Sequence, residues 1–411
     1  MGIFANPLTD LLEYEDFSRD FLKGTDPVGM TGCIDSEKVH FMSTFLGEKK
    51  VQLVVTYNEQ RAREIEEDYK LFCSQVYVIP PRDLIFFSAD LQGNAIIAER
   101  MKAFAALYQN EAKVIITTMD ALMSAAVPFE QLMSHVIKLK EGDELDLEKL
   151  KHDLTVMGYE RVGRVEEPGQ FTVHGGIADV YPLTMEVPVR IELWGDEIDT
   201  IRCFEPQSQR SMDQIECVSV FPAAEVIADD TARRRAVGMI QNELESQLAV
   251  FKKAKEPDKA KRLREETNRI LEALGEDVVL EAPDSYISYF YPRTVQLSEY
   301  FDEKNTLVFL DEPMRLKERG DGVQAEFEES MKNRLEQGFL LPGQTALLTP
   351  AKHVLAAFER GQVAALSSLD SRLADFTVVN SYAVNVQNMN TYREGFELLI
   401  KDLTHWKKEK Y

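Results

Sequence analysis

The feature that most constrains the fold is an alternation of short apolar runs and helical stretches early in the chain. Residues 51–56, 76–79 and 114–118 are rich in β-branched and aliphatic side chains, as is typical of buried parallel strands. Stretches with helical character, about residues 58–72 and 95–108, separate them. Parallel neighbours need a crossover connection, so this β-α-β-α-β order predicts an α/β fold built on a parallel sheet.

The rhythm breaks in the middle of the chain and resumes after it. Short strand-like runs with turn signals, including Trp-Gly-Asp-Glu at 194–197, predict a small inserted α+β domain. A charged helical stretch at 229–276, broken near Pro257, predicts a helical hairpin. Apolar runs at 306–310 and 362–366 then resume the α/β pattern. We expect an α/β lobe in two parts (1–121 and 223–375), the inserted domain (122–222) and the truncated start of a following domain (376–411).

Composition narrows the class of protein. The 411 residues carry a net charge of −23, which argues against DNA as the main partner of this chain. The four cysteines and six histidines are scattered without metal-ligand spacing, so we expect no metal site. No apolar run reaches the roughly 18 residues of a membrane span, and no signal-peptide core is present. We therefore expect a reduced, cytoplasmic protein with no membrane contact.

A glycine-rich segment, Gly29-Met-Thr-Gly-Cys-Ile-Asp-Ser36, lies where a first strand would turn into a helix. A P-loop, GxxxxGK[ST], wraps phosphates with its glycine backbone, neutralises them with its lysine and holds Mg²⁺ with its hydroxyl. Here Cys33 follows Gly32 where the lysine would stand, and Lys38 comes too late in the helix to replace it. The segment therefore lacks the counter-charge that a nucleotide needs.

Asp311 and Glu312 end a later apolar run, where nucleotide hydrolases place the acids that hold Mg²⁺. With Gly29, Gly32 and Ser36 they indicate the degenerate remnant of a helicase-type nucleotide site. The alternative is that glycine turns and strand-end acids only cap helices and bind no ligand. On either interpretation we expect no catalytic residue and no bound cofactor in this chain.

Four segments carry a resemblance to known repair proteins. They read MGYERV at 157–162, EPGQFTVHGGIADVYP at 167–182, PVRIELWGDEID at 188–199 and QRS at 209–211. This pattern resembles a signature shared by the excision-repair protein UvrB and the bacterial transcription-repair coupling factor family. The resemblance runs from about residue 20 to the end of the chain.

Two departures favour the coupling factor family over UvrB. UvrB keeps an intact P-loop, and it carries an aromatic-rich β-hairpin for which residues 80–90 are too short here. The stretch at 388–399 also resembles the start of the next domain in coupling factors. The chain is identified as similar to the N-terminal, UvrB-like region of that family, a helicase-like lobe with a degenerate nucleotide site and an inserted domain.

The resemblance implies a recruiting rather than a catalytic role. In that family an RNA-polymerase-binding domain, a DNA translocase motor and a C-terminal regulatory domain follow this region. The chain would recruit UvrA to stalled RNA polymerase and restrain the motor through intramolecular contacts. RNA polymerase, DNA, ATP and Mg²⁺ would be engaged only by the full-length protein.

A candidate surface for UvrA lies in the run 189–194. Its aliphatic residues alternate with Arg190, Glu192 and Trp194, which places the latter on the outer face of a strand. Arg and Trp side by side are typical of an interface hot spot, and the resemblance implies that they belong to the UvrA-binding face. The alternative is that Trp194 packs on its own hairpin while Arg190 pairs with Glu192 or Asp199.

Two further points stay open. His174 stands where coupling factors usually carry Arg, so it is a candidate partner contact with less positive charge at pH 7. A competing function is that of a UvrB-like ATP-dependent DNA repair helicase, which nucleotide binding would reveal. A third is DNA binding through the basic stretch 252–264, which the overall negative charge disfavours.

Overall fold

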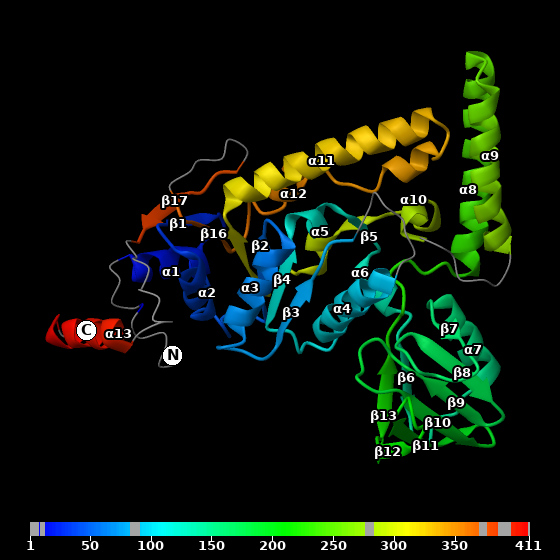
Figure 1. The fold of residues 1–411 in the computed structure, drawn as a ribbon, viewed down its shortest axis with the longest axis horizontal. Coiled ribbons are helices and arrows are strands. Elements are labelled where there is room, and N and C mark those ends of the chain that lie inside the picture. Colours follow the sequence, from blue (N-terminus) through cyan, green and yellow to red (C-terminus); the bar gives the residue numbers. More distant parts are fainter. Residues whose placement is uncertain are drawn as a thin grey trace.

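The computed structural model describes residues 8, 13–82, 91–275, 283–369, 376–384 and 396–409. Its largest element is a seven-stranded sheet in which all neighbouring strands are parallel (Figure 1). In order across the sheet, the strands are β17 (Asn380–Ala383), β1 (Val28–Thr31), β16 (Val363–Ser367), β15 (Thr306–Asp311), β2 (Val51–Thr56), β4 (Val114–Thr118) and β3 (Val76–Ile79). The predicted α/β fold with a parallel sheet is confirmed.

Helices cover both faces of this sheet. One face packs against α1 (Tyr14–Lys23), α2 (Asp35–Ser43) and α3 (Glu59–Tyr69). The other packs against α4 (Leu91–Tyr108), α5 (Met119–Met123), α11 (Pro313–Glu336) and α12 (Ala351–Ala356). In β2 all six residues are buried, and its neighbours Leu53 and Val54 enter opposite cores. The apolar runs of the sequence are therefore continuous rather than alternating because both faces are buried.

The carboxyl ends of the strands meet along one edge of the sheet. α2 begins at this edge shortly after β1, and α3 begins there after β2. The Asn58 side chain caps α3 by accepting a hydrogen bond from the Arg61 backbone N–H at 2.8 Å. β15 ends at the same edge with Asp311. In open α/β sheets this edge is where ligands bind, so the side chains here decide whether the lobe holds a nucleotide.

Two further sheets lie in residues 137–220. The six-stranded sheet runs β12 (Ser211–Gln214), β11 (Glu197–Phe204), β10 (Val189–Trp194), β9 (Ile177–Val180), β8 (Gln170–His174) and β7 (Glu160–Arg161). β6 (Ile137–Lys140) pairs with β13 (Cys217–Val220), and α7 (Leu147–Val156) joins them in a core that is separate from those of the large sheet. Gly195 has φ +67 in the turn between β10 and β11, so the predicted hairpin is present.

A long helical hairpin stands out from one end of the lobe, as Figure 1 shows in green. It consists of α8 (Asp230–Ala254) and α9 (Pro257–Gly275), as the sequence pattern predicted. Lys255 ends α8 in the left-handed conformation, with φ 59, and Pro257 starts α9. The base of the hairpin packs on α10 (Ile287–Phe290) and contributes to the core that α4 and α11 share.

Several elements bear on the domain boundaries that the sequence predicts. β5 (Ala125–Ala126) pairs with β14 (Val295–Gln296), and α6 (Phe129–Met133) enters the core of the large lobe, although β5 and α6 both follow the predicted boundary at 122. β17 extends the large sheet although it follows the boundary at 375, while α13 (Phe396–Glu409) is amphipathic and largely exposed. Among the described residues no helix is long and apolar enough to cross a membrane.

Candidate functional site

The glycines of the nucleotide-site remnant take part in strand packing. Gly29 lies within β1, and Gly32 follows it with φ +85. A Cβ at Gly32 would lie 1.9 Å from the carbonyl oxygen of Val384, so only glycine fits where the chain after β17 passes. Ser36 lies in the first turn of α2, and its side chain is outside the described residues. Gly32 is therefore explained by a close backbone approach alone.

The side chain of Lys38 lies at the carboxyl end of β15, beside the two acids Asp311 and Glu312. Its side chain is 0% exposed, and its Nζ donates to Asp311 Oδ1 at 2.8 Å and to Glu312 Oε1 at 2.6 Å. Asp35 lies farther away, at 3.8 Å, and is exposed. Sequence analysis predicted that Lys38 comes too late in the helix to replace the lysine of a P-loop. Its long side chain instead reaches from α2 to the end of β15, where it pairs with the two acids.

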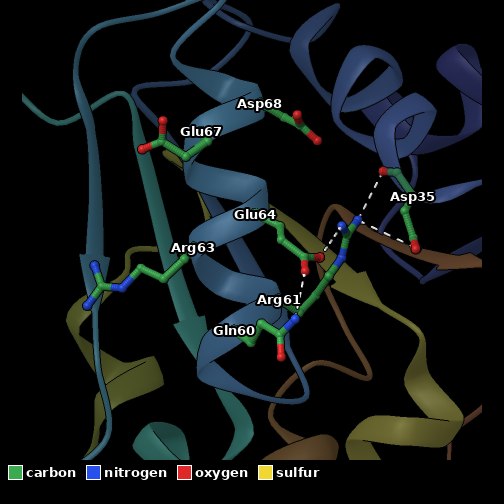
Figure 2. A pocket seen from close by; sticks show the side chains of 7 residues that line it. All are labelled: Asp35, Gln60, Arg61, Arg63, Glu64, Glu67 and Asp68. Carbon is green, nitrogen blue, oxygen red and sulfur yellow. Dashed lines mark hydrogen bonds and ion pairs between the residues drawn. The ribbon is translucent and has the colours of Figure 1, made fainter. Parts of the chain in front are cut away.

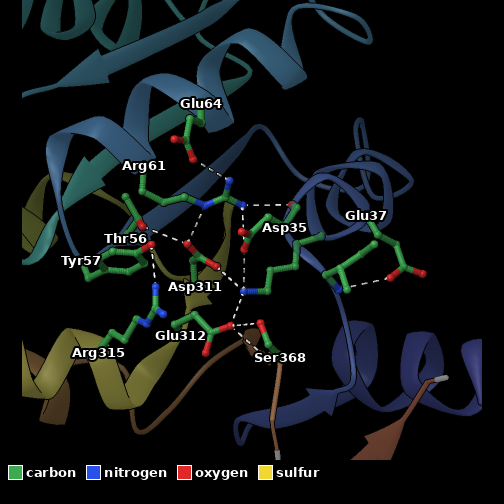
Figure 3. A network of polar contacts seen from close by, with 12 residues as sticks. Asp35, Glu37, Thr56, Tyr57, Arg61, Glu64, Asp311, Glu312, Arg315 and Ser368 are labelled. Carbon is green, nitrogen blue, oxygen red and sulfur yellow. Dashed lines mark hydrogen bonds and ion pairs between the residues drawn. The ribbon is translucent and has the colours of Figure 1, made fainter. Parts of the chain in front are cut away.

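Arg61 on α3 supplies a second internal cation (Figure 3). Its Nε donates to Asp311 Oδ2 at 3.3 Å, and its guanidinium also reaches the Asp35 carbonyl oxygen at 2.9 Å. Thr56 Oγ1 donates to the same Asp311 oxygen at 2.9 Å. Both carboxylate oxygens of Asp311, whose side chain is 1% exposed, are thus engaged by neighbouring side chains. We call Lys38, Arg61, Asp311 and Glu312 the strand-end cluster.

Glu312 completes this cluster at the start of α11. It adopts a left-handed conformation with φ 54, and its carboxylate accepts hydrogen bonds from the Ser368 backbone N–H, at 2.8 Å, and from the Ser368 hydroxyl. Burial alone would raise the pKa of Glu312, but the hydrogen bonds from Lys38 and Ser368 outweigh it and lower the pKa. Burial alone would lower the pKa of Lys38, but Asp311 and Glu312 raise it. Both groups are therefore held in their charged forms.

The concave surface beside the cluster is acidic. It has a volume of about 650 Å³ and is lined by Asp35, Gln60, Arg61, Arg63, Glu64, Glu67 and Asp68 (Figure 2). Both of its arginines are already paired, Arg61 with Glu64 at 3.2 Å and Arg63 with Glu99 at 2.6 Å. The lining holds four acidic side chains and two arginines, so its net negative charge repels phosphate groups and the surface is poorly suited to a nucleotide. The described residues hold no group of three or more His, Cys, Asp or Glu side chains that could bind a metal ion.

The outer face of the six-stranded sheet carries both charged and exposed apolar side chains, unlike the strand-end cluster. Strand register aligns Asp179 with Arg190 and Arg202 in one row, and His174 with Ile177 and Glu192 in the next. Sequence analysis predicted that Arg190, Trp194 and His174 belong to one partner-binding surface. Arg190 and His174 lie in adjacent rows of this face, and Trp194 lies at the end of β10 in the hairpin with β11.

Arg190 is fixed in place by its neighbours. Its guanidinium donates to both Asp179 oxygens, at 2.8 and 2.7 Å, and lies 4.8 Å from the centre of the Phe204 ring. These hydrogen bonds, together with charge attraction to Asp179, raise the pKa of Arg190. The alternative pairing with Glu192 or Asp199 is not the one found. Asp179 lies on the neighbouring strand and was not recognised from sequence, because only the strand register reveals it.

Trp194 is the most exposed large apolar side chain of the described residues. It is 85% exposed, so it does not fold over its own hairpin. Ile177, on β9, and Met212, on β12, are also exposed on this sheet. His174 is exposed at the end of β8, next to Gly175, which has φ +60. Single exposed apolar side chains are common, but three on one small sheet, one of them a tryptophan, make this sheet a candidate protein-binding surface.

The class of this domain follows from its sequence family. Residues 137–225 match the family model described as the UvrB interaction domain, and they include every strand of the six-stranded sheet. The chain therefore contains a UvrB interaction domain joined to a helicase-like α/β lobe.

Relatives extend this assignment to most of the chain. It is 30% identical over 342 residues to the transcription-repair-coupling factor of Bacillus subtilis, covering 82% of this chain and 29% of the relative. It is 30% identical over 348 residues to that of Staphylococcus epidermidis (84% and 29%) and 30% identical over 334 residues to that of Staphylococcus haemolyticus (79% and 28%). The chain is thus related to transcription-repair-coupling factors, and it spans about 29% of the length of these relatives.

Proposed function

We propose that this chain recruits UvrA in transcription-coupled nucleotide excision repair. The UvrB interaction domain provides the docking surface, and the outer face around Trp194 makes the contact. The observation that carries this proposal is the 85% exposure of Trp194 within the segment that matches the domain family. A tryptophan buried in a partner's pocket is among the side chains that contribute most to protein–protein affinity.

Arg190 supports this contact because its neighbours already hold its side chain in one position. Its two hydrogen bonds to Asp179 and its stacking on Phe204 fix the guanidinium before any partner arrives. A preformed side chain loses little conformational entropy on binding, so it favours affinity. His174, on the adjacent row, would add a further contact.

The α/β lobe serves as a scaffold rather than an enzyme in this proposal. Support comes from the strand-end cluster, in which Lys38 and Arg61 already neutralise the acids that would hold Mg²⁺. We therefore propose no catalytic residue and no nucleotide, metal or other cofactor for this chain. ATP and Mg²⁺ would serve the motor of the full-length protein. This chain would also restrain that motor through intramolecular contacts, and RNA polymerase and DNA would be engaged only by the full-length protein.

The experiment is a binding measurement between this chain and purified UvrA, by isothermal titration calorimetry. Trp194→Ala should weaken binding by about 30-fold or more, which corresponds to about 2 kcal/mol. Leu71→Ala is the matched control, because Leu71 is 77% exposed but lies after α3 in the other lobe. Equal affinities for wild type and a folded Trp194→Ala variant would refute the proposed surface. Tight ATP binding that disappears in Asp311→Asn would instead favour the helicase alternative.

A further inference from the structure

The tip of the helical hairpin is basic, although the molecule as a whole is acidic. Residues 252–264 include seven Lys or Arg and two acidic residues, in a chain whose net charge is −23. These residues end α8, form the turn and begin α9. Figure 1 shows the hairpin extending away from the UvrB interaction domain. The tip therefore offers a basic surface that is remote from the proposed UvrA contact.

A groove lies between the two helices at this tip. Its volume is about 460 Å³. Four apolar residues line it, which we call the floor: Leu248, Ala249, Pro257 and Ala260. Four exposed cations also line it, which we call the rim: Lys252, Lys255, Lys261 and Arg264, with Glu256 as the one acid. Glu256 is already paired with Lys259 at 2.9 Å. The groove thus combines apolar contact area with positive charge that its own acid does not neutralise.

Three of the four rim cations are available for binding. Among the described residues, Lys252, Lys255 and Arg264 have no acidic partner within ion-pair distance. Arg262, on the same helix, provides the contrast, because it donates to the Gln337 carbonyl oxygen at 2.8 Å and lies over the Phe339 ring. The carboxyl-terminal dipole of α8 favours Lys252 where it stands. This dipole does not explain the position of Arg264, because Arg264 lies in the interior of α9.

We propose that this groove binds an acidic, amphipathic peptide segment of a partner protein. The apolar side chains of the segment would lie on Leu248, Pro257 and Ala260, while its carboxylates would meet the rim cations. An amphipathic helix in an apolar groove with a charged rim is a common recognition mode. A nucleic-acid backbone is less well matched, because it gains nothing from the apolar floor and is repelled by the net charge of −23.

The test is fluorescence anisotropy with the full chain and three labelled probes. The first is an acidic peptide with Leu and Phe at helical spacing, the second has the same composition in scrambled order, and the third is a short DNA duplex. We expect saturable binding of the first probe, at least about tenfold tighter than binding of the other two. Stronger binding of DNA, equal binding of both peptides, or no binding would each overturn the proposal.

Variants of the chain test whether the acidic peptide binds in this groove. Lys252→Ala/Lys255→Ala/Arg264→Ala should weaken binding of the peptide about tenfold or more. Lys113→Ala/Lys332→Ala/Lys352→Ala is the control, since it removes the same charge from exposed sites elsewhere. Ala249→Asp, at an exposed position on the groove floor, should also weaken binding without disturbing the core. If the control triple weakens binding as much as the tip triple, the groove is not the site. Trp194→Ala should leave peptide binding unchanged, which separates this proposal from UvrA recruitment.

Discussion

The strand-end cluster and the outer face of the UvrB interaction domain use similar side chains in opposite ways. In the cluster, Lys38 is 0% exposed and both of its carboxylate partners belong to the same chain. On the outer face, Arg190 keeps 21% of its side chain in water and stands in the same strand as Trp194, which is 85% exposed. The charged groups of the strand-end cluster pair with one another, whereas the outer face exposes apolar surface.

This difference shows how a ligand-binding edge can become a structural element. The carboxyl edge of a parallel sheet gathers polar side chains whatever the protein does. When the acids there meet Lys38 and Arg61, the charges that would attract Mg²⁺ hold α2, α3 and α11 against the sheet instead. In the proposed function, recognition then depends on a separate domain whose outer face is exposed.

The largest effect should come from removing the buried cation. Lys38→Met keeps much of the side-chain volume but leaves Asp311 and Glu312 close together without Lys38 between them. Breaking a buried ion pair in this way typically costs about 3–5 kcal/mol. We expect the free energy of unfolding, from urea denaturation at pH 7, to fall by about that amount.

A control and a second variant keep this expectation testable. Lys261→Met removes an exposed lysine whose nearest ion-pair distance is 3.8 Å, and it should change stability by less than about 1 kcal/mol. Lys38→Met/Glu312→Gln should recover part of the loss, because it removes the carboxylate that has lost its ion pair with Lys38, whereas Asp311 keeps Arg61. A Lys38→Met protein as stable as wild type would mean that the cluster is not a structural element.

The general architecture could be predicted from sequence, whereas the cluster could not. Apolar runs such as 51–56 and 114–118 report burial on both faces, and burial is a local property of each strand. The pairing of Lys38 with Asp311 joins residues 273 positions apart, so no local pattern contains it. The one sign in the sequence that Lys38 is buried was its place next to apolar residues of α2, Val39 and Phe41, both of which are buried.

The outer face should respond less strongly to loss of its cation. Arg190→Ala leaves Asp179, which is largely buried, without its two charge-assisted hydrogen bonds. Hydrogen bonds to charged groups typically contribute about 1.5–3 kcal/mol, and partial exposure of Arg190 places this one at the lower end. Urea denaturation should therefore show a smaller loss than for Lys38→Met.

Trp194→Ala is the matched variant for this prediction. Trp194 lies in the same strand but is almost fully exposed, so its removal should change the free energy of unfolding by less than about 0.5 kcal/mol. A loss as large as that of Arg190→Ala would mean that Trp194 supports the fold, which would weaken its assignment as a partner contact. Sequence alternation placed both residues on one face, but it could not separate the paired side chain from the free one.

A smaller effect than that of Lys38→Met should follow when the Glu312 carboxylate is removed from the strand-end cluster. The pKa of Glu312 is lowered in the folded protein, so its contribution is fully present above the unfolded value of about 4.5 and is lost as pH falls through the folded pKa. At pH 7, Glu312→Gln should cost about 1–2 kcal/mol, because a neutral amide replaces the carboxylate beside Lys38. The difference from wild type should begin to shrink below about pH 4.5, where the carboxyl is protonated in the unfolded chain, and should be lost once pH falls below the lowered pKa of folded Glu312.

Glu37 provides a control with the opposite sign on the same helix as Lys38. Burial raises its pKa, so its ionisation costs stability as pH rises from the unfolded value to the folded one. Glu37→Gln should therefore be at least as stable as wild type at pH 7, and an amide oxygen can still accept from the Ile34 N–H as the carboxylate does. Urea denaturation of both variants between pH 3 and pH 7 measures this contrast. If both differences from wild type follow the same pH course, Lys38 does not hold Glu312 in its charged form. The contrast between a closed edge and an open face would then rest on the outer face alone.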